Sequence, residues 1–225
     1  MIVKKVTDLI GNTPMLQLKM KNNNWNVYLK LEKFNPGGSM KDRMALNMIE
    51  QAEKSGKLKP GGTIIESSSG NTAIGLAIAS AIKGYKFIAV VDHHASKEKI
   101  DMIKAYGGET VVVGDDYGAN EVAVIERERT AKRMSEEIEN SFFPNQADNF
   151  DNRSAYINTL AKELIDELGV VDIFYAAIGT GGSSCGTAIG LKNYNSNTLI
   201  NVIEPDGSIL FGGEGKPYFQ SGTGN

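Results

Sequence analysis

Short apolar segments alternate with longer amphipathic segments along most of the chain. The short segments are rich in β-branched and aromatic residues, so we predict β-strands at residues 27–31, 63–65, 87–91, 110–113, 173–178 and 199–203. Several of them are apolar at successive positions rather than at alternate ones. This pattern is typical of strands that are covered on both faces of a parallel sheet.

The amphipathic segments predict helices at residues 41–54, 97–106, 120–139 and 154–168, and a further helix that begins near Gly182. Residues 71–83 are almost wholly apolar and predict a buried helix. Glycines follow three of these segments, at Gly56, Gly107 and Gly169, as is usual at helix C-termini. Alternating strands and helices indicate an α/β fold built on parallel sheets. Residues 207–225 are glycine-rich, show no periodicity and are predicted to form a loop.

The composition is that of an ordinary globular protein, with 41% hydrophobic and 23% charged residues. A formal net charge of −3 argues against a broad surface for nucleic acids or anionic membranes, which would need a basic excess. No apolar run approaches the ~20 residues of a membrane span, and the first residues lack the apolar core of a secretory signal. The single cysteine, Cys185, excludes an intramolecular disulfide and a cysteine-based zinc cluster, and we predict no metal site. A cytoplasmic protein is the resulting expectation.

Glycine is used more often than the typical ~7%, with 25 in 225 residues. Clusters of glycine and serine occur at residues 36–39, 67–75 and 179–186. Each cluster lies where an apolar segment gives way to a helical pattern. Glycine at such a position allows the backbone to approach a ligand closely.

The sequence NPGGSMKDR at residues 35–43 leads into the first predicted helix. Ser39 is a natural helix N-cap, and Asp42 three residues later completes an S-x-x-D capping pattern. Lys41 is thereby placed in the first helical turn, where the helix dipole disfavours an ammonium and favours the neutral amine that forms imines. A solvated lysine at a helix start is the alternative interpretation.

The sequence ESSSGNTAIG at residues 66–75 joins a predicted strand to a predicted helix. Free backbone N–H groups at a helix N-terminus bind carboxylates and phosphates. A capping turn with surplus serines is the alternative. A turn needs only one cap, however, and five polar side chains are available here, which favours an anion-binding loop. They are Ser67, Ser68, Ser69, Asn71 and Thr72.

The sequence IGTGGSSCG at residues 178–186 also joins a strand to a helix. Its glycines and serines are suited to wrapping a phosphate with backbone N–H groups and hydroxyls. It is not a G-x-G-x-x-G fingerprint, because Ser184 occupies the third glycine position, and the chain has no G-x-x-x-x-G-K-[ST] motif. These departures favour a phosphate-carrying cofactor other than a dinucleotide or a nucleoside triphosphate.

Taken together, the three loops resemble those of the cysteine synthase / cystathionine β-synthase family, the fold-type II enzymes that use pyridoxal 5′-phosphate. The resemblance runs from Ile10 to Phe211 and rests on segments in the family's order and at similar spacing. These segments are IGNTPM at 10–15, NPGGSMKDR at 35–43, SSGNT at 68–72, NQ at 145–146 and GTGGS at 179–183. The resemblance implies an α/β fold like that of tryptophan synthase β, with two three-layer domains built on parallel sheets.

The resemblance also implies a role for each site residue. Lys41 would form the Schiff base with the cofactor and later act as acid and base at the substrate α-carbon. Asn71 would hydrogen-bond the 3′-oxygen of the cofactor. The cofactor phosphate would be held by Gly179, Thr180, Gly181, Gly182 and Ser183. The substrate α-carboxylate would be bound by Ser68, Ser69, Gly70, Asn71, Thr72 and Gln146.

The reaction implied by the resemblance is a β-replacement, in which an activated L-serine loses its β-substituent through an α-aminoacrylate and a nucleophile then adds. The expected activity is that of a cysteine synthase, on O-acetyl- or O-phospho-L-serine with sulfide. The segments VDHHAS at 91–96 and GSILFGG at 207–213 look closer to the N-(2-amino-2-carboxyethyl)-L-glutamate synthases of 2,3-diaminopropionate pathways, so L-glutamate as an amine nucleophile is an alternative. A cysteine desulfhydrase or cystathionine β-synthase-like activity and a non-catalytic binding relative are the others.

The resemblance further implies a smaller, substrate-closing domain at residues 41–145 and a larger, cofactor-binding domain formed by residues 1–40 and 146–225. Family members continue beyond position 225, and that part normally supplies the serine or threonine that faces the pyridine nitrogen. We therefore expect the larger domain to be incomplete at its C-terminus and the sequence to be a fragment; a truncated protein with an incomplete site is the alternative. By analogy with the family, we expect a homodimer that acts on a small-molecule amino acid and binds neither nucleic acid nor membrane.

Overall fold

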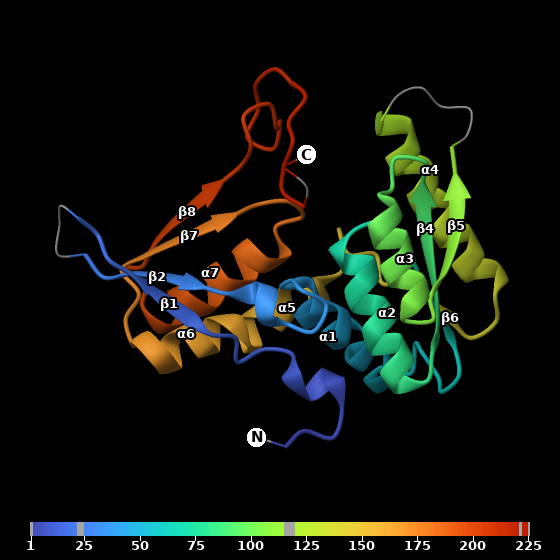
Figure 1. Cartoon of the computed structure of the whole chain (residues 1–225), viewed down its shortest axis with the longest axis horizontal. Helices are drawn as coiled ribbons and strands as arrows, with labels where there is room; N and C mark the ends of the chain where they lie inside the picture. The colour runs from blue at the N-terminus through green and yellow to red at the C-terminus, as the bar shows by residue number, and fades with distance from the viewer. Residues whose placement is uncertain (1, 22–24, 115–119, 221, 225) are drawn as a thin grey trace.

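The computed structural model describes residues 2–21, 25–114, 120–220 and 222–224. Figure 1 shows two groups of strands and helices on either side of the helices α1 and α5. The strands are β1 Met15–Leu18, β2 Val27–Lys30, β3 Thr63–Ser67, β4 Lys86–Asp92, β5 Glu109–Val113, β6 Ser141–Phe142, β7 Ile173–Ala177 and β8 Leu199–Ile203. The α-helices are α1 Lys41–Lys54, α2 Asn71–Lys83, α3 Lys97–Ala105, α4 Asn120–Glu137, α5 Phe150–Asn158, α6 Leu160–Leu168 and α7 Gly182–Tyr194. The 3-10 helices are η1 Val6–Leu9 and η2 Glu32–Phe34.

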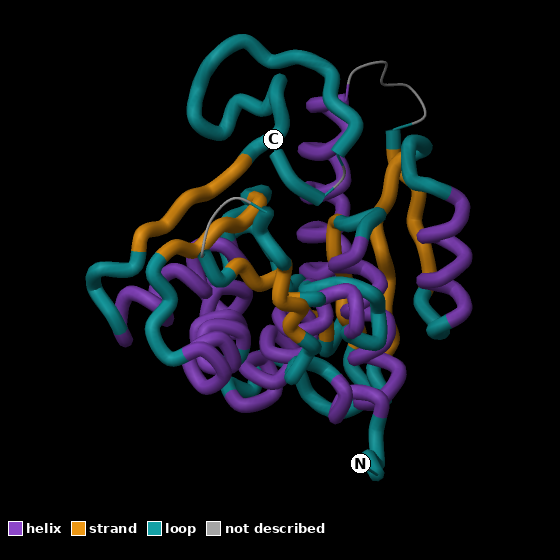
Figure 2. Tube along the Cα trace, turned by 60° about the vertical axis from the view of Figure 1, so that its left-hand side comes forward, coloured by secondary structure: helices purple, strands orange, loops and turns teal. Residues whose placement is uncertain are grey.

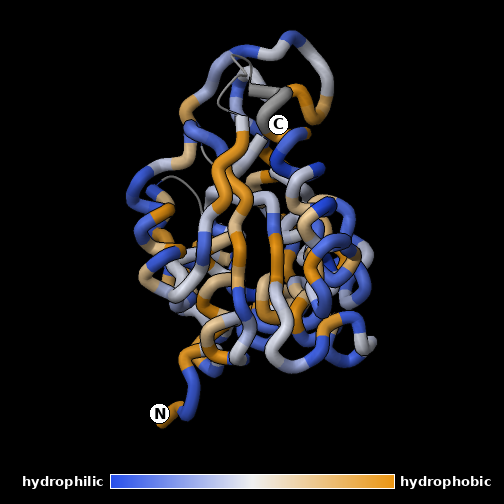
Figure 3. Tube along the Cα trace, turned by 90° about the vertical axis from the view of Figure 1, so that its right-hand side faces the viewer, coloured by the Kyte–Doolittle hydropathy of each residue, from blue (hydrophilic) through white to orange (hydrophobic). Residues whose placement is uncertain are grey.

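The largest sheet is parallel throughout and has the strand order β5-β4-β3-β6. Helices α2 and α3 cover one face and α4 covers the other, so helices enclose the strands from two sides (Figure 2). All five residues of β3 are buried, as the run of successive apolar positions predicts for a strand covered on both faces. In Figure 3 the strands at the centre of this sheet are largely hydrophobic, while the flanking helices alternate in hydropathy.

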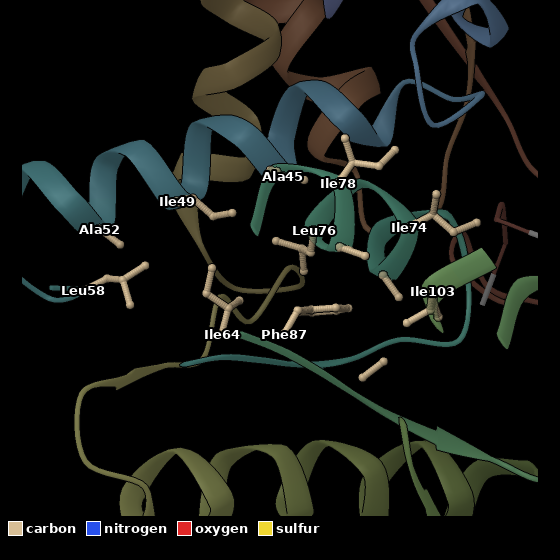
Figure 4. Packing of buried hydrophobic residues seen from close by; sticks show 14 of the residues in the cluster. Ala45, Ile49, Ala52, Leu58, Ile64, Ile74, Leu76, Ile78, Phe87 and Ile103 are labelled. Atoms are coloured by element: carbon tan, nitrogen blue, oxygen red, sulfur yellow. The ribbon is translucent and has the colours of Figure 1, made fainter. Parts of the chain in front are cut away.

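The main hydrophobic core lies between this sheet and the helices α1 and α2 (Figure 4). Ala45 and Ile49 of α1 face α2, and Ile64 of β3 and Phe87 of β4 approach from the sheet. Because α2 lies between the sheet and α1, an almost wholly apolar helix is stable there. The unbroken apolar pattern of residues 71–83 is therefore explained by burial on several sides.

The remaining strands of the described residues form two smaller sheets. β1 and β2 pair in antiparallel fashion, and β7 and β8 pair in parallel. Alternate residues of β7 are exposed, including Ile173 and Tyr175, and β8 shows the same alternation. The prediction of strands covered on both faces is thus wrong for this pair within the described residues, because α7 packs on one face only.

The predicted strands and the predicted α/β fold with parallel sheets are confirmed, as are the helices at residues 41–54 and 71–83. The single helix predicted at residues 154–168 is wrong. Two helices, α5 and α6, meet at Thr159, whose backbone leaves the helical region with φ −122° and ψ −74°. The Thr159 hydroxyl donates to the carbonyl of Ala155 at 2.7 Å, a local bond that competes with continued helix.

A buried group of charges joins α1 to α6 and η2. Arg43 is 3% exposed, and its guanidinium donates to Glu32 at 2.7 Å (Nε–Oε2) and to Glu163 at 2.8 Å (Nη2–Oε2). Lys30 of β2 also contacts Glu163 at 3.0 Å. Each carboxylate is therefore paired, which a buried charge requires.

Candidate active site

Lys41 is the first residue of α1. Met40, not Ser39, occupies the N-cap position, and no side chain caps the helix, so the predicted S-x-x-D capping pattern is wrong. Ser39 Oγ instead accepts the N–H of Lys41 at 3.1 Å, and Asp42 Oδ2 accepts the N–H of Gly37 at 2.5 Å. The carboxylate of Asp42 thus stabilises the glycine turn before α1 and does not cap the helix N-terminus.

The side-chain amine of Lys41 has no hydrogen-bond or ion-pair partner among the residues that the structure describes. Burial of the side chain lowers the pKa of Lys41 below its usual value. The sequence predicts this lowering of the pKa from the helix dipole, whereas in the structure burial is its cause. A lysine with a lowered pKa supplies the neutral amine that acts as a nucleophile or a base.

The segment at residues 67–72, called the serine loop below, connects the end of β3 to the start of α2. Ser68 Oγ accepts the N–H of Gly70 at 3.2 Å and so stabilises the turn. The first bond of the helix runs from the N–H of Ile74 to the carbonyl of Gly70 at 3.3 Å. The N–H groups of the intervening residues 71–73 therefore have no carbonyl within the helix, and they can bind an anion.

Gln146 lies beside the serine loop and is held from three sides. Thr72 Oγ1 donates to Gln146 Oε1 at 2.6 Å. The backbone N–H of Gln146 donates to Glu66 Oε2 at 3.3 Å, and its carbonyl accepts from Asn152 Nδ2 at 2.7 Å. Two residues predicted to bind the same carboxylate, Thr72 and Gln146, are thus in direct contact although 74 positions separate them.

Glu66, the fourth residue of β3, is 1% exposed and lies under the serine loop. Its Oε1 atom accepts the N–H of Ser67 at 2.9 Å, so one carboxyl group joins the loop to Gln146. Burial raises the pKa of Glu66 to about 8, against the lowering effect of the hydrogen bonds from Gln146 and Ser67. No pattern in the sequence marks Glu66 as a site residue, because a carboxylate at the end of a strand has no distinctive signature.

The raised pKa of Glu66 predicts a loss of stability with increasing pH. In the unfolded chain a glutamate titrates near pH ~4.3, so between that pH and about 8 the folded state keeps a proton that the unfolded state has released. The free energy of unfolding should therefore fall as pH rises through this window, and Glu66→Gln should remove that part of the fall. Urea unfolding at several pH values measures it.

Glu53 provides a matched control for this experiment. Its pKa is lowered, because the hydrogen bonds from Lys83 and Tyr85 outweigh its desolvation. Stability from Glu53 is present above its unfolded pKa and is lost as pH falls, so Glu53→Gln should change the pH slope in the opposite sense. Equal slopes for the wild type and Glu66→Gln would contradict the account.

The segment at residues 179–183, called the glycine loop below, connects β7 to α7. Gly181 has φ +83°, a left-handed conformation that favours glycine. The first bond of α7 runs from the N–H of Cys185 to the carbonyl of Gly181 at 2.8 Å, which leaves the preceding N–H groups available to a ligand. Thr180 is exposed, and Ser183 is half-buried. The loop has the free donors that a phosphate needs.

Helix α5 contacts two of the three predicted loops directly and the third, the serine loop, through Gln146. The Tyr156 hydroxyl donates to the carbonyl of Met40, next to Lys41, at 2.9 Å. Asn152 donates to Gln146, and its Oδ1 atom lies so close to Gly182 that a Cβ there would be 2.2 Å away. Only glycine therefore fits at this position. The contact of Tyr156 with Met40 joins residues 116 positions apart, and no local pattern predicts it.

In the described part of the chain, the predicted site residues lie in one region around α5. The serine loop and Gln146 form one contiguous group, and Asn152 connects this group to the glycine loop. Lys41 joins the same region through Met40 and Tyr156 of α5, and its side chain has no hydrogen bond to either loop. The roles assigned to these residues remain predictions.

Within the described residues, the side chains of histidine, cysteine, aspartate and glutamate form no group of three that could hold a metal ion. A search of the same residues finds no helix with the length and apolarity needed to cross a membrane.

Residues 6–223 match the model of one family, the pyridoxal-phosphate dependent enzymes, and the chain belongs to this family. It is 48% identical to a putative cysteine synthase of Sinorhizobium fredii over 225 residues, which cover all of this chain and 67% of that protein. A hydrogen sulfide-producing enzyme from Fusobacterium nucleatum superposes with a TM-score of 0.91 and 38% identity, over 100% of this chain and 73% of that one. An O-acetylserine dependent cystathionine β-synthase from Helicobacter pylori superposes with a TM-score of 0.90 and 37% identity, with the same coverage.

The residues present fit the cofactor of this family. Pyridoxal phosphate needs an amine that is not engaged by a carboxylate and a set of donors for its phosphate. Lys41 supplies the amine, since its Nζ atom has no partner among the described residues. The glycine loop supplies the donors, and the absence of a side chain at Gly182 keeps the start of α7 open beside Asn152.

Proposed function

We propose that the protein is a cysteine synthase, which replaces the β-substituent of O-acetyl- or O-phospho-L-serine with sulfide. The observation that supports this most strongly is that α5 contacts Met40 next to Lys41, Gln146 beside the serine loop, and Gly182 of the glycine loop. A lysine amine, an anion-binding helix N-terminus and a phosphate cradle are the groups that such a reaction needs. The names of the relatives agree with this chemistry.

Each part of the proposed site has a physical task. Bound pyridoxal phosphate supplies the electron sink for negative charge at the substrate α-carbon. The glycine loop would hold its phosphate, from Gly179 to Ser183, and Asn71 would donate to its 3′-oxygen. Lys41, whose pKa is lowered by burial, would remove and return the proton at the α-carbon.

The serine loop and Gln146 would bind and orient the substrate α-carboxylate. Ser68, Ser69 and Thr72 offer hydroxyl groups, and Gly70 and Asn71 bring the backbone of the helix start close to the ligand. The bond from Thr72 to Gln146 Oε1 turns the carboxamide so that its N–H groups face away from Thr72 and are free to donate. Fixing the carboxylate in this way orients the bond to the β-substituent relative to Lys41.

We also propose a division of the chain into two domains and an oligomeric state. The parallel sheet of residues 63–142 falls within the proposed smaller domain at residues 41–145, and α7 with β7 and β8 belongs to the proposed larger domain of residues 1–40 and 146–225. We propose a cytoplasmic homodimer, by analogy with the family.

The test is a comparison of acceptors with the purified, cofactor-loaded protein. O-Acetylserine and O-phosphoserine are each incubated with sulfide and, separately, with L-glutamate, and the released acetate or phosphate and the amino acid product are quantified. We expect cysteine to accumulate with sulfide. Release of the β-substituent only in the presence of L-glutamate would show that the acceptor is an amine and not sulfide. The absence of release with every pair of substrates would overturn the proposal.

A further inference from the structure

The serine loop contains only neutral residues, whereas the proposed ligand of this loop is a carboxylate. The first turn of α2, whose residues are all described, also has no charged side chain that could offset the negative charge of the carboxylate. One cation close to this loop is Lys99 on α3, which packs against α2 (Figure 1). A methyl group built on Gly70 would lie 3.9 Å from Lys99 Nζ and 3.9 Å from Ser68 Oγ.

The position of Lys99 is fixed by the packing of α3. Ser96 caps this helix, and its Oγ atom accepts the N–H of Lys99 at 3.4 Å. Ile103, one turn further on, is 0% exposed and belongs to the main core. Residues four positions apart share a face of a helix, and side chains lean towards the helix N-terminus, so Lys99 is directed along the face that packs inward and towards the serine loop.

The ammonium of Lys99 has no hydrogen-bond or ion-pair partner in the described parts of the chain. Lys97, two residues earlier, has a different environment, since its Nζ atom contacts Asp101 at 2.6 Å and its side chain is 85% exposed. Lys99 is only half-buried and lies beside free backbone N–H groups, so a carboxylate bound there would be its counter-ion. A cation without a counter-ion next to free N–H donors is the arrangement that an anionic ligand completes.

We propose that Lys99 is a specificity-determining residue that supplies the positive charge of the carboxylate-binding loop. The proposal rests on the proposed function only for the identity of the ligand as an α-amino acid. It predicts that the loop binds a free carboxylate more tightly than an uncharged carboxamide. The neutral N–H and hydroxyl donors would contribute to binding, and the charge of Lys99 would provide the selectivity. Because the contact is between charges at a partly solvated site, it should weaken as salt concentration rises.

The experiment measures binding of L-alanine and L-alaninamide to the cofactor-loaded protein by calorimetry, at low and at high salt. L-Alanine has no β-substituent to lose, so binding is observed without turnover. In Lys99→Gln we expect the dissociation constant of L-alanine to rise about tenfold, the range for a hydrogen bond to a charged group, with little change for L-alaninamide. Lys99→Arg should restore most of the affinity, because the charge is retained.

Lys97→Gln is the matched control, since it removes the same charge from the same helix turn. It should leave both dissociation constants unchanged. An equal effect of Lys97→Gln and Lys99→Gln, an equal loss for the amide, or no binding of L-alanine to the wild type would overturn the proposal. A protein that binds L-alanine through Lys99 but converts no serine ester would leave this inference standing and refute the proposed function instead.

Discussion

Replacing Lys41 with alanine is expected to lower turnover of the serine ester by about 10²- to 10⁴-fold, the usual contribution of a positioned acid or base. The expectation follows from the position of the amine at the start of α1, from its lowered pKa and from the absence of a partner among the described residues. The same absence predicts that the free energy of unfolding changes little, since no hydrogen bond or ion pair of the amine is lost. Steady-state kinetics and urea unfolding together measure the two effects.

Lys54→Ala is the control for this substitution, because Lys54 lies in the last turn of the same helix and is exposed. It should retain full activity. Lys41→Arg should not restore activity, since a guanidinium remains protonated and cannot take up a proton. Turnover within a factor of a few of the wild type in Lys41→Ala would show that another group moves the α-proton.

Replacing Arg43 with methionine is expected to destabilise the protein by about 3–5 kcal/mol, the cost of leaving buried carboxylates without their partner. The Arg43 side chain is 1% exposed and donates to both Glu32 and Glu163. Arg133→Met is the control, since Arg133 and Glu137 are both 66% exposed and 4.0 Å apart. That exposed pair should contribute no more than about 1 kcal/mol. Equal unfolding midpoints in urea for the two variants would contradict the prediction.

The same network predicts a loss of stability in acid. Burial alone would raise the pKa of Glu163, but the hydrogen bonds from Arg43 and from the N–H of Asn12 lower it to about 2. Stability from Glu163 is therefore complete above the unfolded pKa of ~4.3 and is lost as pH falls towards 2. In Arg43→Met the pKa of Glu163 loses its main lowering partner, so this acid-dependent loss should shrink.

Elements with a strong local pattern were predictable from sequence. The limits of α1 follow from amphipathic periodicity and from the glycine after it, those of α2 follow from its long apolar segment, and β3 and β4 follow from short apolar runs. β1 and β6 were not predicted, because they are short and become strands only by pairing with β2 and β3. The break at Thr159 was missed because a hydroxyl that bonds the preceding turn leaves no mark on hydrophobic periodicity.

The candidate site shows the same division. Lys41, the serine loop and the glycine loop stand out as residue patterns, because each lies at a helix start. Glu66, Asn152 and Lys99 do not, because each acquires its role from a partner distant in sequence: Gln146, Gly182 and Gly70. The Ser39 cap failed for a related reason, since Asp42 bonds Gly37 across the turn instead of the helix end.

The most direct test of the central claim is the visible absorption spectrum of the protein loaded with pyridoxal phosphate, titrated with O-acetylserine and then with O-phosphoserine. We expect a yellow band that depends on Lys41, that shifts when one of the two esters is added and that returns when sulfide is supplied. A band that no serine ester shifts, or that is the same in Lys41→Ala, would contradict an active site built from Lys41, the serine loop and the glycine loop.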